Sequence, residues 1–172
     1  MTSGLRLVDD VLEVVPDNDA CLHTLADAPW RRIGADDLLP RDVGDADSDG
    51  VLTFSPSTEE GGGIVYRTRE AASKAGAAWD PKAEILTAFS RASTDSPAAG
   101  QGDLLQRLCL TPPDRTEYHN DAAWGVADGG RYPIRGGYWV NREMAGIFSY
   151  GFYMTTADRW FDVGFRSCYV ER

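Results

Sequence analysis

A short Asp-rich segment near residue 50 has the residue types and spacing of a calcium-binding loop. Asp45, Asp47 and Asp49 place carboxylates at the first, third and fifth positions of such a loop, and Gly50 supplies the sharp turn that follows. The bidentate Glu expected at the last position is missing, because Pro56 stands there. The pattern makes the three aspartates candidate calcium ligands, with an Asp-rich turn that binds no ion as the alternative.

Other residues that could carry chemistry are scattered along the chain. The cysteines are Cys21, Cys109 and Cys168, and the histidines are His23 and His119. No CxxC pair occurs, whereas a zinc site needs clustered Cys and His ligands. Asp121, close to His119, is the remaining acid or base candidate, and no Ser or Cys stands in a nucleophile elbow. We therefore predict that the chain is not an enzyme.

The C-terminal part combines three Gly-containing motifs with many aromatic and polar side chains. The motifs are GGYW at 136–139, AGIF at 145–148 and VGFR at 163–166. Between them lie Tyr, Trp and Phe side chains mixed with Arg, Asn, Ser and Asp. Aromatic residues give a recognition surface large contact area at low entropy cost, and polar neighbours give it directional hydrogen bonds. This composition is typical of a binding surface.

In this order, the three motifs resemble the C-terminal signature of the C-type-lectin-like fold. That fold is shared by formylglycine-generating enzymes, sulfatase-modifying-factor-like proteins and the variable proteins of diversity-generating retroelements. The segment AAWG at 122–125 and the pair Arg131-Tyr132 add to the resemblance, which covers residues 118–170, about a third of the chain. The resemblance implies a single α+β domain over residues 1–172, with its ligand-binding part at 118–172.

The enzymes of this group use metal ligands whose pattern is missing here. Formylglycine-generating enzymes work through a cysteine pair that binds copper, and Cys109 and Cys168 form no close pair in the sequence. Related sulfoxide-forming enzymes use a His/His/Glu iron site, and the chain has no HxxxHxE pattern. A formylglycine-type metal oxidase is therefore the least favoured alternative, and the binding branch of the group fits better.

In the retroelement-diversified proteins, which include phage tropism determinants, the side chains between the GGxW and GFR motifs are exposed and variable. The corresponding display positions in this chain are Tyr138, Val140, Asn141, Arg142, Met144, Ser149, Tyr150, Phe152, Tyr153, Arg159, Trp160, Phe161 and Asp162. We expect the Tyr and Trp rings of this set to be exposed, because these rings have a polar end. Burial in the core is the alternative, and it is as strong as exposure for Phe152 and Phe161.

The N-terminal two thirds must supply most of the scaffold. Residues 5–15 favour a strand, and short strands are predicted at 51–54 and 64–66 within loop-rich sequence. A helix is predicted at 69–78 after a Thr68 cap. A second is predicted at 81–92, where Asp80-Pro81 supplies an N-cap and a Pro at the first helical position.

The C-terminal third has closely spaced turns, so strands are expected at 136–140, 145–149 and 163–170, while residues 104–110 fit either a helix or a strand. We expect Trp139 in the core, and Arg135 and Arg166 to clamp carboxylates or main-chain carbonyls within the fold. The predicted architecture is α+β, with two helices packed on small irregular antiparallel sheets with long loops.

Charge is distributed unevenly along the chain. The net charge is -10, and residues 1–60 carry all of the excess, with 14 acidic against 4 basic side chains. Such a surface disfavours a nucleic-acid partner, because phosphate backbones need concentrated positive charge. The acidic part at 1–60 is a candidate attachment segment. No apolar run is long enough for a membrane span, and the start lacks the features of a signal peptide.

Together these features predict a receptor-recognition protein rather than a catalyst. The resemblance places it in a phage or phage-like tail, binding a host surface protein or glycan. The absence of a signal peptide then implies export within a virion or other particle, and otherwise a cytoplasmic protein. The alternative is a structural virion component that uses the same surface for self-association or for contacts with other tail proteins. Neither nucleic acid nor membrane is an expected partner.

Overall fold

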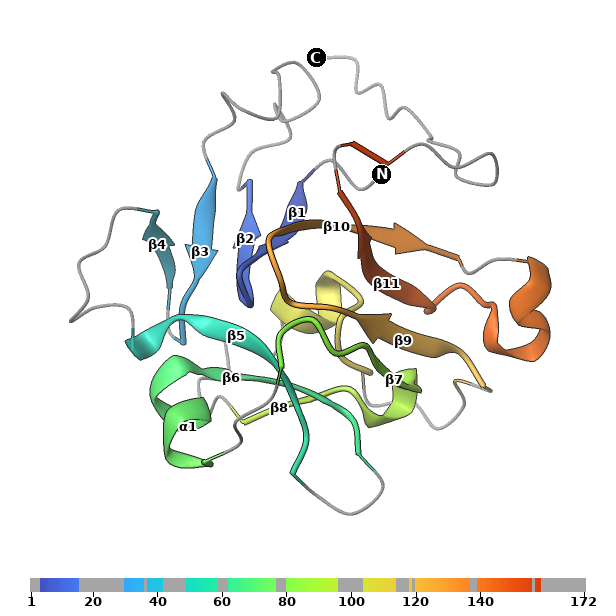
Figure 1. Cartoon of the computed structure of the whole chain (residues 1–172), viewed down its shortest axis with the longest axis horizontal. Helices are drawn as coiled ribbons and strands as arrows, with labels where there is room; N and C mark the ends of the chain where they lie inside the picture. The colour runs from blue at the N-terminus through green and yellow to red at the C-terminus, as the bar shows by residue number, and fades with distance from the viewer. Residues whose placement is uncertain are drawn as a thin grey trace.

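The computed structural model describes residues 4–15, 30–35, 37–41, 49–58, 62–76, 80–95, 104–113, 118, 120–136, 139–155 and 157–158. Within these residues the protein is a mixed α+β structure, in which a curled eleven-stranded sheet is accompanied by short helical segments (Figure 1). None of the described helices is long and apolar enough to cross a membrane.

The helices and strands are short, in keeping with apolar residues that are dispersed along the sequence. The strands are β1 (Leu5–Val8), β2 (Val11–Val14), β3 (Arg31–Ile33), β4 (Leu38–Pro40), β5 (Leu52–Pro56), β6 (Ile64–Thr68), β7 (Ile85–Ala88), β8 (Ser93–Thr94), β9 (Ala122–Gly125), β10 (Gly130–Arg135) and β11 (Tyr150–Met154). The helices are α1 (Arg69–Lys74) and the 3-10 segments η3 (Phe89–Arg91) and η4 (Trp139–Met144), and one helical turn lies at 104–107.

The strand order is β7-β9-β11-β10-β1-β2-β5-β6-β8, and β3 and β4 extend the sheet from β2. Strand β2 has two neighbours on one side, because Val11 pairs with Thr53 of β5 while Glu13 pairs with Arg32 of β3. This division lets the sheet curl around a core instead of lying flat. Most pairs are antiparallel, but β9–β11 and β6–β8 are parallel. The expectation of small antiparallel sheets is therefore corrected to one large mixed sheet.

The strand predicted at 5–15 is a hairpin of β1 and β2. Its two-residue turn consists of Asp9 and Asp10, which both have positive φ, at 46° and 72°. A two-residue hairpin turn with positive φ at both positions favours Asn, Asp and Gly, and its twist matches the strands that flank it. The Asp9 carboxylate also accepts a hydrogen bond from the backbone N–H of Gly129 (2.9 Å), which ties the hairpin to the turn before β10. The N-terminal part thus belongs to the same sheet as the C-terminal part.

The core lies inside the curl of the sheet and is rich in aromatic side chains. Phe54 packs edge-on against Tyr66 and Phe152, with ring centroids 6.1 and 6.0 Å away. Tyr150 is fully buried beside Phe152. Strands β5, β6 and β11 therefore meet at one aromatic cluster, although they are distant in the sequence. The strands predicted at 51–54 and 64–66 are confirmed as the cores of β5 and β6.

One of the two predicted helices is confirmed in part and the other is wrong. α1 begins after Thr68, whose hydroxyl accepts a hydrogen bond from the backbone N–H of Ala71 (3.2 Å), as an N-cap does. The predicted helix at 81–92 is instead a turn, strand β7 and η3. β7 pairs antiparallel with β9, so pairing with a distant strand overrides the local helix signal. Ile85 and Thr87 are β-branched, which suits a strand.

Two C-terminal strands were also predicted wrongly. β10 ends at Arg135, the segment at 139–144 is the 3-10 helix η4, and β11 begins only at Tyr150. Residues 145–149 form turns, and residues 104–107 a helical turn. The predicted strand at 163–170 lies outside the described residues, as do Arg166 and the side chain of Trp139.

The predicted structural role of Arg135 is confirmed. Its guanidinium donates to the carbonyl of Cys109 (2.7 Å) and to that of Leu108, and it lies over the ring of Tyr150. Burial lowers the pKa of this guanidinium from its ordinary value. Arg135 therefore holds the chain after the helical turn at 104–107 against β10. Cys109, the acceptor, is a half-buried free thiol, and the other cysteines lie outside the described residues.

Candidate functional site

The segment that links η4 to β11 is a tight series of turns. Ala145 donates its N–H to the carbonyl of Arg142 and Ser149 donates to Gly146, both at 3.1 Å. Arg142 adopts φ 51° and ψ −118°, a backbone conformation that residues other than Gly seldom take. Such backbone persists only where the surroundings determine it, and two buried polar side chains hold this segment.

Ser149 is one of those groups. Its buried hydroxyl donates to the carbonyl of Met144 (2.7 Å) and accepts from the N–H groups of Gly146 (3.0 Å) and Ala122 (3.2 Å). One hydroxyl therefore satisfies three backbone groups from η4, the turn and β9. The structure corrects the prediction that Ser149 is displayed, because its side chain is enclosed and fixes the backbone.

Asp121 is the second group. Its side chain is 7% exposed, and Oδ2 accepts the N–H of Phe148 at 2.9 Å. Its backbone also takes part, since its carbonyl accepts the N–H of Phe89. A Cβ added to Gly146 would lie 1.9 Å from Oδ1 of Asp121, so the glycine is required by this close approach. The acid or base candidate of the sequence is thus a support of the AGIF turn.

Beside this turn lies a pocket of about 590 Å³. It is lined by Tyr118, Asn120, Asp121, Glu143, Ala145, Gly146, Ile147 and Phe148. The Phe148 ring stacks on Phe89 (5.5 Å, 12°) and meets the edge of Tyr118 (5.3 Å, 82°), which makes one wall aromatic and rigid. Ile147 stands at the mouth with 84% of its surface exposed. No sequence pattern predicts this pocket as a unit, although Asp121 and the AGIF motif form parts of it.

The structure buries two further residues that were predicted to be displayed. Tyr150 and Phe152 are both fully buried, and their rings pack against each other (5.9 Å) inside the sheet. A tyrosine is often exposed at its polar end, but the hydroxyl of Tyr150 finds partners in the core, at Tyr66 (2.7 Å) and at the carbonyl of Leu110 (3.2 Å). The exposed-ring prediction is therefore wrong for Tyr150, and the core alternative holds for Phe152.

Three predicted display residues are exposed: Arg142, Met144 and Tyr153. Arg142 and Met144 belong to η4 beside the pocket. Tyr153 lies three residues along β11 from Tyr150, about 10 Å at the rise of a strand, so it forms a separate part of the surface. Val140 and Asn141 lie in η4, but their side chains are outside the described part of the structure. Tyr138, Arg159, Trp160, Phe161 and Asp162 also lie outside the described residues.

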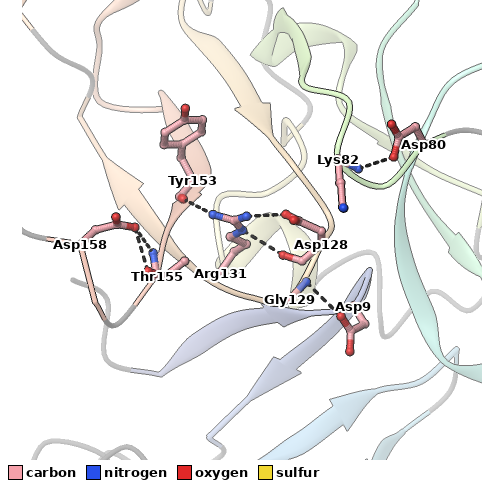
Figure 2. Close-up of polar contacts among 9 residues, drawn as sticks. All are labelled: Asp9, Asp80, Lys82, Asp128, Gly129, Arg131, Tyr153, Thr155 and Asp158. Carbon is pink, nitrogen blue, oxygen red and sulfur yellow. Dashed lines mark hydrogen bonds and ion pairs between the residues drawn. The ribbon is translucent and has the colours of Figure 1, made fainter.

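Polar contacts fix the backbone around Tyr153 (Figure 2). The guanidinium of Arg131 donates to the carbonyl of Tyr153 (2.9 Å) and to that of Asp128 (2.9 Å), and it pairs with the Asp128 carboxylate. Beyond the strand, Thr155 donates its N–H to Asp158 (2.7 Å). The ring of Tyr153 points away from these contacts in Figure 2 and is 42% exposed. It is thus free to contact another molecule from a fixed position.

The calcium prediction lies largely beyond the part that the structure describes. Asp45 and Asp47 are outside the described residues, and Asp49 is exposed at the turn before β5. Among the described residues, no group of three or more His, Cys, Asp or Glu side chains could hold a metal ion. Calcium at Asp45, Asp47 and Asp49 stays a prediction.

No protein-family model matches the chain, and no curated protein matches it in sequence.

Proposed function

We propose that this chain is a ligand-recognition protein on a C-type-lectin-like scaffold, set in the tail of a phage or phage-like particle. Its ligand is a protein or glycan of a host surface. The mixed α+β structure with its curled sheet is compatible with that scaffold, and the motifs at 136–139, 145–148 and 163–166 support it. The proposed recognition surface consists of Arg142, Met144 and Ile147 with the pocket beside them, and of Tyr153 as a separate exposed part.

The main support for this proposal is the location of the exposed apolar side chains. The described residues leave four large hydrophobic side chains exposed: Leu86, Met144, Ile147 and Tyr153. Two of the four, Met144 and Ile147, lie three residues apart in η4 and in the turn that lines the pocket. Single exposed apolar residues are ordinary, but a concentration of them beside a pocket is typical of an interaction surface.

Rigid support of the surface favours recognition as well. Ser149 and Asp121 hold the AGIF turn from its buried side, and Arg131 holds the backbone of Tyr153. A surface whose backbone is already fixed loses less entropy when it binds, so more of the contact energy appears as affinity. A buried polar framework beneath exposed side chains also allows those side chains to differ without loss of the fold.

Retention of the full chain on arrays of bacterial surface glycans and surface proteins tests the proposal. Ile147→Ser and Met144→Ser should each weaken retention on the cognate molecule by about tenfold or more, as loss of a central apolar contact does. Leu86→Ser is the matched control, since Leu86 is 61% exposed on β7 and does not line the pocket. Equal retention of all three variants, or no retention of the wild type anywhere, would sink the proposal.

A structural virion component is the second candidate, because exposed apolar side chains also suit a contact between subunits. Sedimentation of the isolated chain separates the two. A stable oligomer that Ile147→Ser dissociates, and that Leu86→Ser leaves intact, would favour the subunit contact. A monomer that binds an array molecule would favour recognition.

A further inference from the structure

We propose that the pocket beside the AGIF turn takes a basic side chain, Arg or Lys, from a protein partner. The inference rests on the proposed recognition function and adds the chemistry of the ligand to it. Two carboxylates, Asp121 and Glu143, line the pocket, and none of the described residues in its lining is Lys, Arg or His. Neither carboxylate forms an ion pair with any residue that the structure describes.

Asp121 is the central residue of this proposal, because only 7% of the residue is exposed. Oδ2 accepts the N–H of Phe148, whereas Oδ1 accepts no hydrogen bond within the described structure. Oδ1 lies against the Cα of Gly146, and both residues line the pocket. A cation that enters the pocket would give this oxygen a charge-assisted hydrogen bond.

The walls of the pocket suit an organic cation. Tyr118 and Phe148 contribute aromatic rings, held edge to face, to its lining. A guanidinium or ammonium group that reached a ring face would be attracted to it. The hydroxyl of Tyr118 donates to the carbonyl of Pro113, so the polar end of that ring is occupied and the ring is fixed. Glu143 is exposed and supplies a second negative charge.

The rim of the pocket favours a cation that is carried by a protein. Ile147 and Met144 are exposed and apolar, and they would contact the surface around a basic side chain while its charged end reaches the carboxylates. The aliphatic stem of Arg or Lys packs on apolar surface in the same way. A small free cation would use the carboxylates but would leave this apolar rim uncovered.

Titration of the full chain with a short peptide, acetyl-Gly-Leu-Arg-Gly-amide, tests the inference by NMR. The backbone amide signals of Gly146 and Phe148 should shift saturably, and 0.5 M NaCl should weaken binding, because salt screens exposed charges over about 3–5 Å at such ionic strength. The citrulline peptide, which is neutral and almost the same shape, should bind at least tenfold more weakly. The Lys peptide should bind in the same place.

Glu143→Gln should weaken the Arg peptide about tenfold, as loss of a charge-assisted hydrogen bond does. Glu84→Gln, at an exposed acid outside the pocket lining, should leave binding unchanged. Equal binding of the Arg and citrulline peptides, or no effect of Glu143→Gln, would overturn the inference. Methylguanidinium that binds as tightly as the peptide would overturn the assignment to a protein partner.

The outcomes separate this inference from the proposed function. If an array molecule is lost with Ile147→Ser but is insensitive to Glu143→Gln, the surface recognises a ligand and the pocket does not hold a cation. If the Arg peptide binds but no array molecule is retained, the pocket assignment stands and the recognition proposal fails.

Discussion

The hydroxyl groups of Tyr66 and Tyr150 are hydrogen-bonded at 2.7 Å inside the core, and they join β6 to β11 across 84 residues of sequence. The Tyr150 hydroxyl has a second contact, to the carbonyl of Leu110 at 3.2 Å. A hydroxyl has one hydrogen to donate, and a carbonyl has none. Tyr150 therefore donates to Leu110, and Tyr66 donates to Tyr150. Because Tyr150 follows Ser149 directly, this chain of bonds connects the core to the candidate recognition surface.

The direction of these bonds predicts unequal effects of two conservative substitutions. Tyr66→Phe removes one donor and leaves Tyr150 bonded to Leu110, so it should lower the free energy of unfolding by about 1 kcal/mol. Tyr150→Phe leaves both the Tyr66 hydroxyl and the Leu110 carbonyl without a partner, and it should cost about 2–3 kcal/mol. Urea unfolding followed by fluorescence measures both. A larger loss for Tyr66→Phe than for Tyr150→Phe would contradict the assigned direction.

The same pair predicts a loss of stability at high pH. Burial raises the pKa of both Tyr66 and Tyr150 above the ordinary value of 10.0, and the bond to Tyr150 raises the pKa of Tyr66 further. Each folded-state pKa is higher than the unfolded one, so this stabilisation is complete below about pH 10 and is lost as the pH rises above it. The urea midpoint should therefore fall as the pH rises above about 10. The fall should be smaller in Tyr66→Phe, and a fall of the same size in that variant would exclude Tyr66 as its source.

Ser149 should behave as a structural residue rather than as a binding residue. Ser149→Ala leaves three backbone groups without their shared partner and should lower the free energy of unfolding by about 2–3 kcal/mol. Ser90, an exposed serine in η3, is the matched control, and Ser90→Ala should change it by less than about 0.5 kcal/mol. Thermal unfolding of both variants checks this difference. Equal stability of the two would show that the hydroxyl of Ser149 does not hold the turn.

Gly146→Ala should disrupt the turn, because the new methyl group would overlap the Asp121 carboxylate. We expect a loss of about 2–4 kcal/mol, from overpacking together with displacement of a buried carboxylate. Gly130→Ala is the control, since a Cβ at Gly130 would meet nothing within 4 Å. Urea unfolding of the two variants compares them directly. A Gly146→Ala protein as stable as Gly130→Ala would mean that Asp121 can move aside freely.

The local features of the fold were readable from the sequence. The hairpin at 5–15 and the strands at 51–54 and 64–66 follow from β-branched and apolar residues between turn residues. The Thr68 cap follows from local chemistry, because its hydrogen bond spans three residues. Features that depend on a neighbour distant in the sequence were not readable. Residues 85–88 follow the helix-start signal of Asp80-Pro81, and it is their pairing with β9, distant in the sequence, that makes them a strand.

The candidate site shows the same limit. The sequence identified Arg142, Met144 and Tyr153 as display positions, and these side chains are exposed. The sequence could not distinguish these exposed residues from Ser149 and Tyr150, which are buried. A polar side chain is buried where it finds hydrogen-bond partners, and the sequence does not show where those partners lie. Those partners, at Ala122 and Tyr66, lie on other strands. The pocket forms because Tyr118, Asn120 and Asp121 lie close to residues 143–148 in the fold. No local sequence pattern predicts that these two segments meet.

The most direct test of the recognition surface is to sequence the codons for residues 118–155 across a population of the source. The account predicts amino-acid changes at Arg142, Met144, Ile147 and Tyr153, whose side chains are exposed. It predicts constant residues at Asp121, Gly146, Ser149 and Tyr150, which hold the backbone beneath them. Exposed codons as constant as these buried ones, or changes spread evenly over both sets, would contradict the proposal that these side chains form a recognition surface of the variable type.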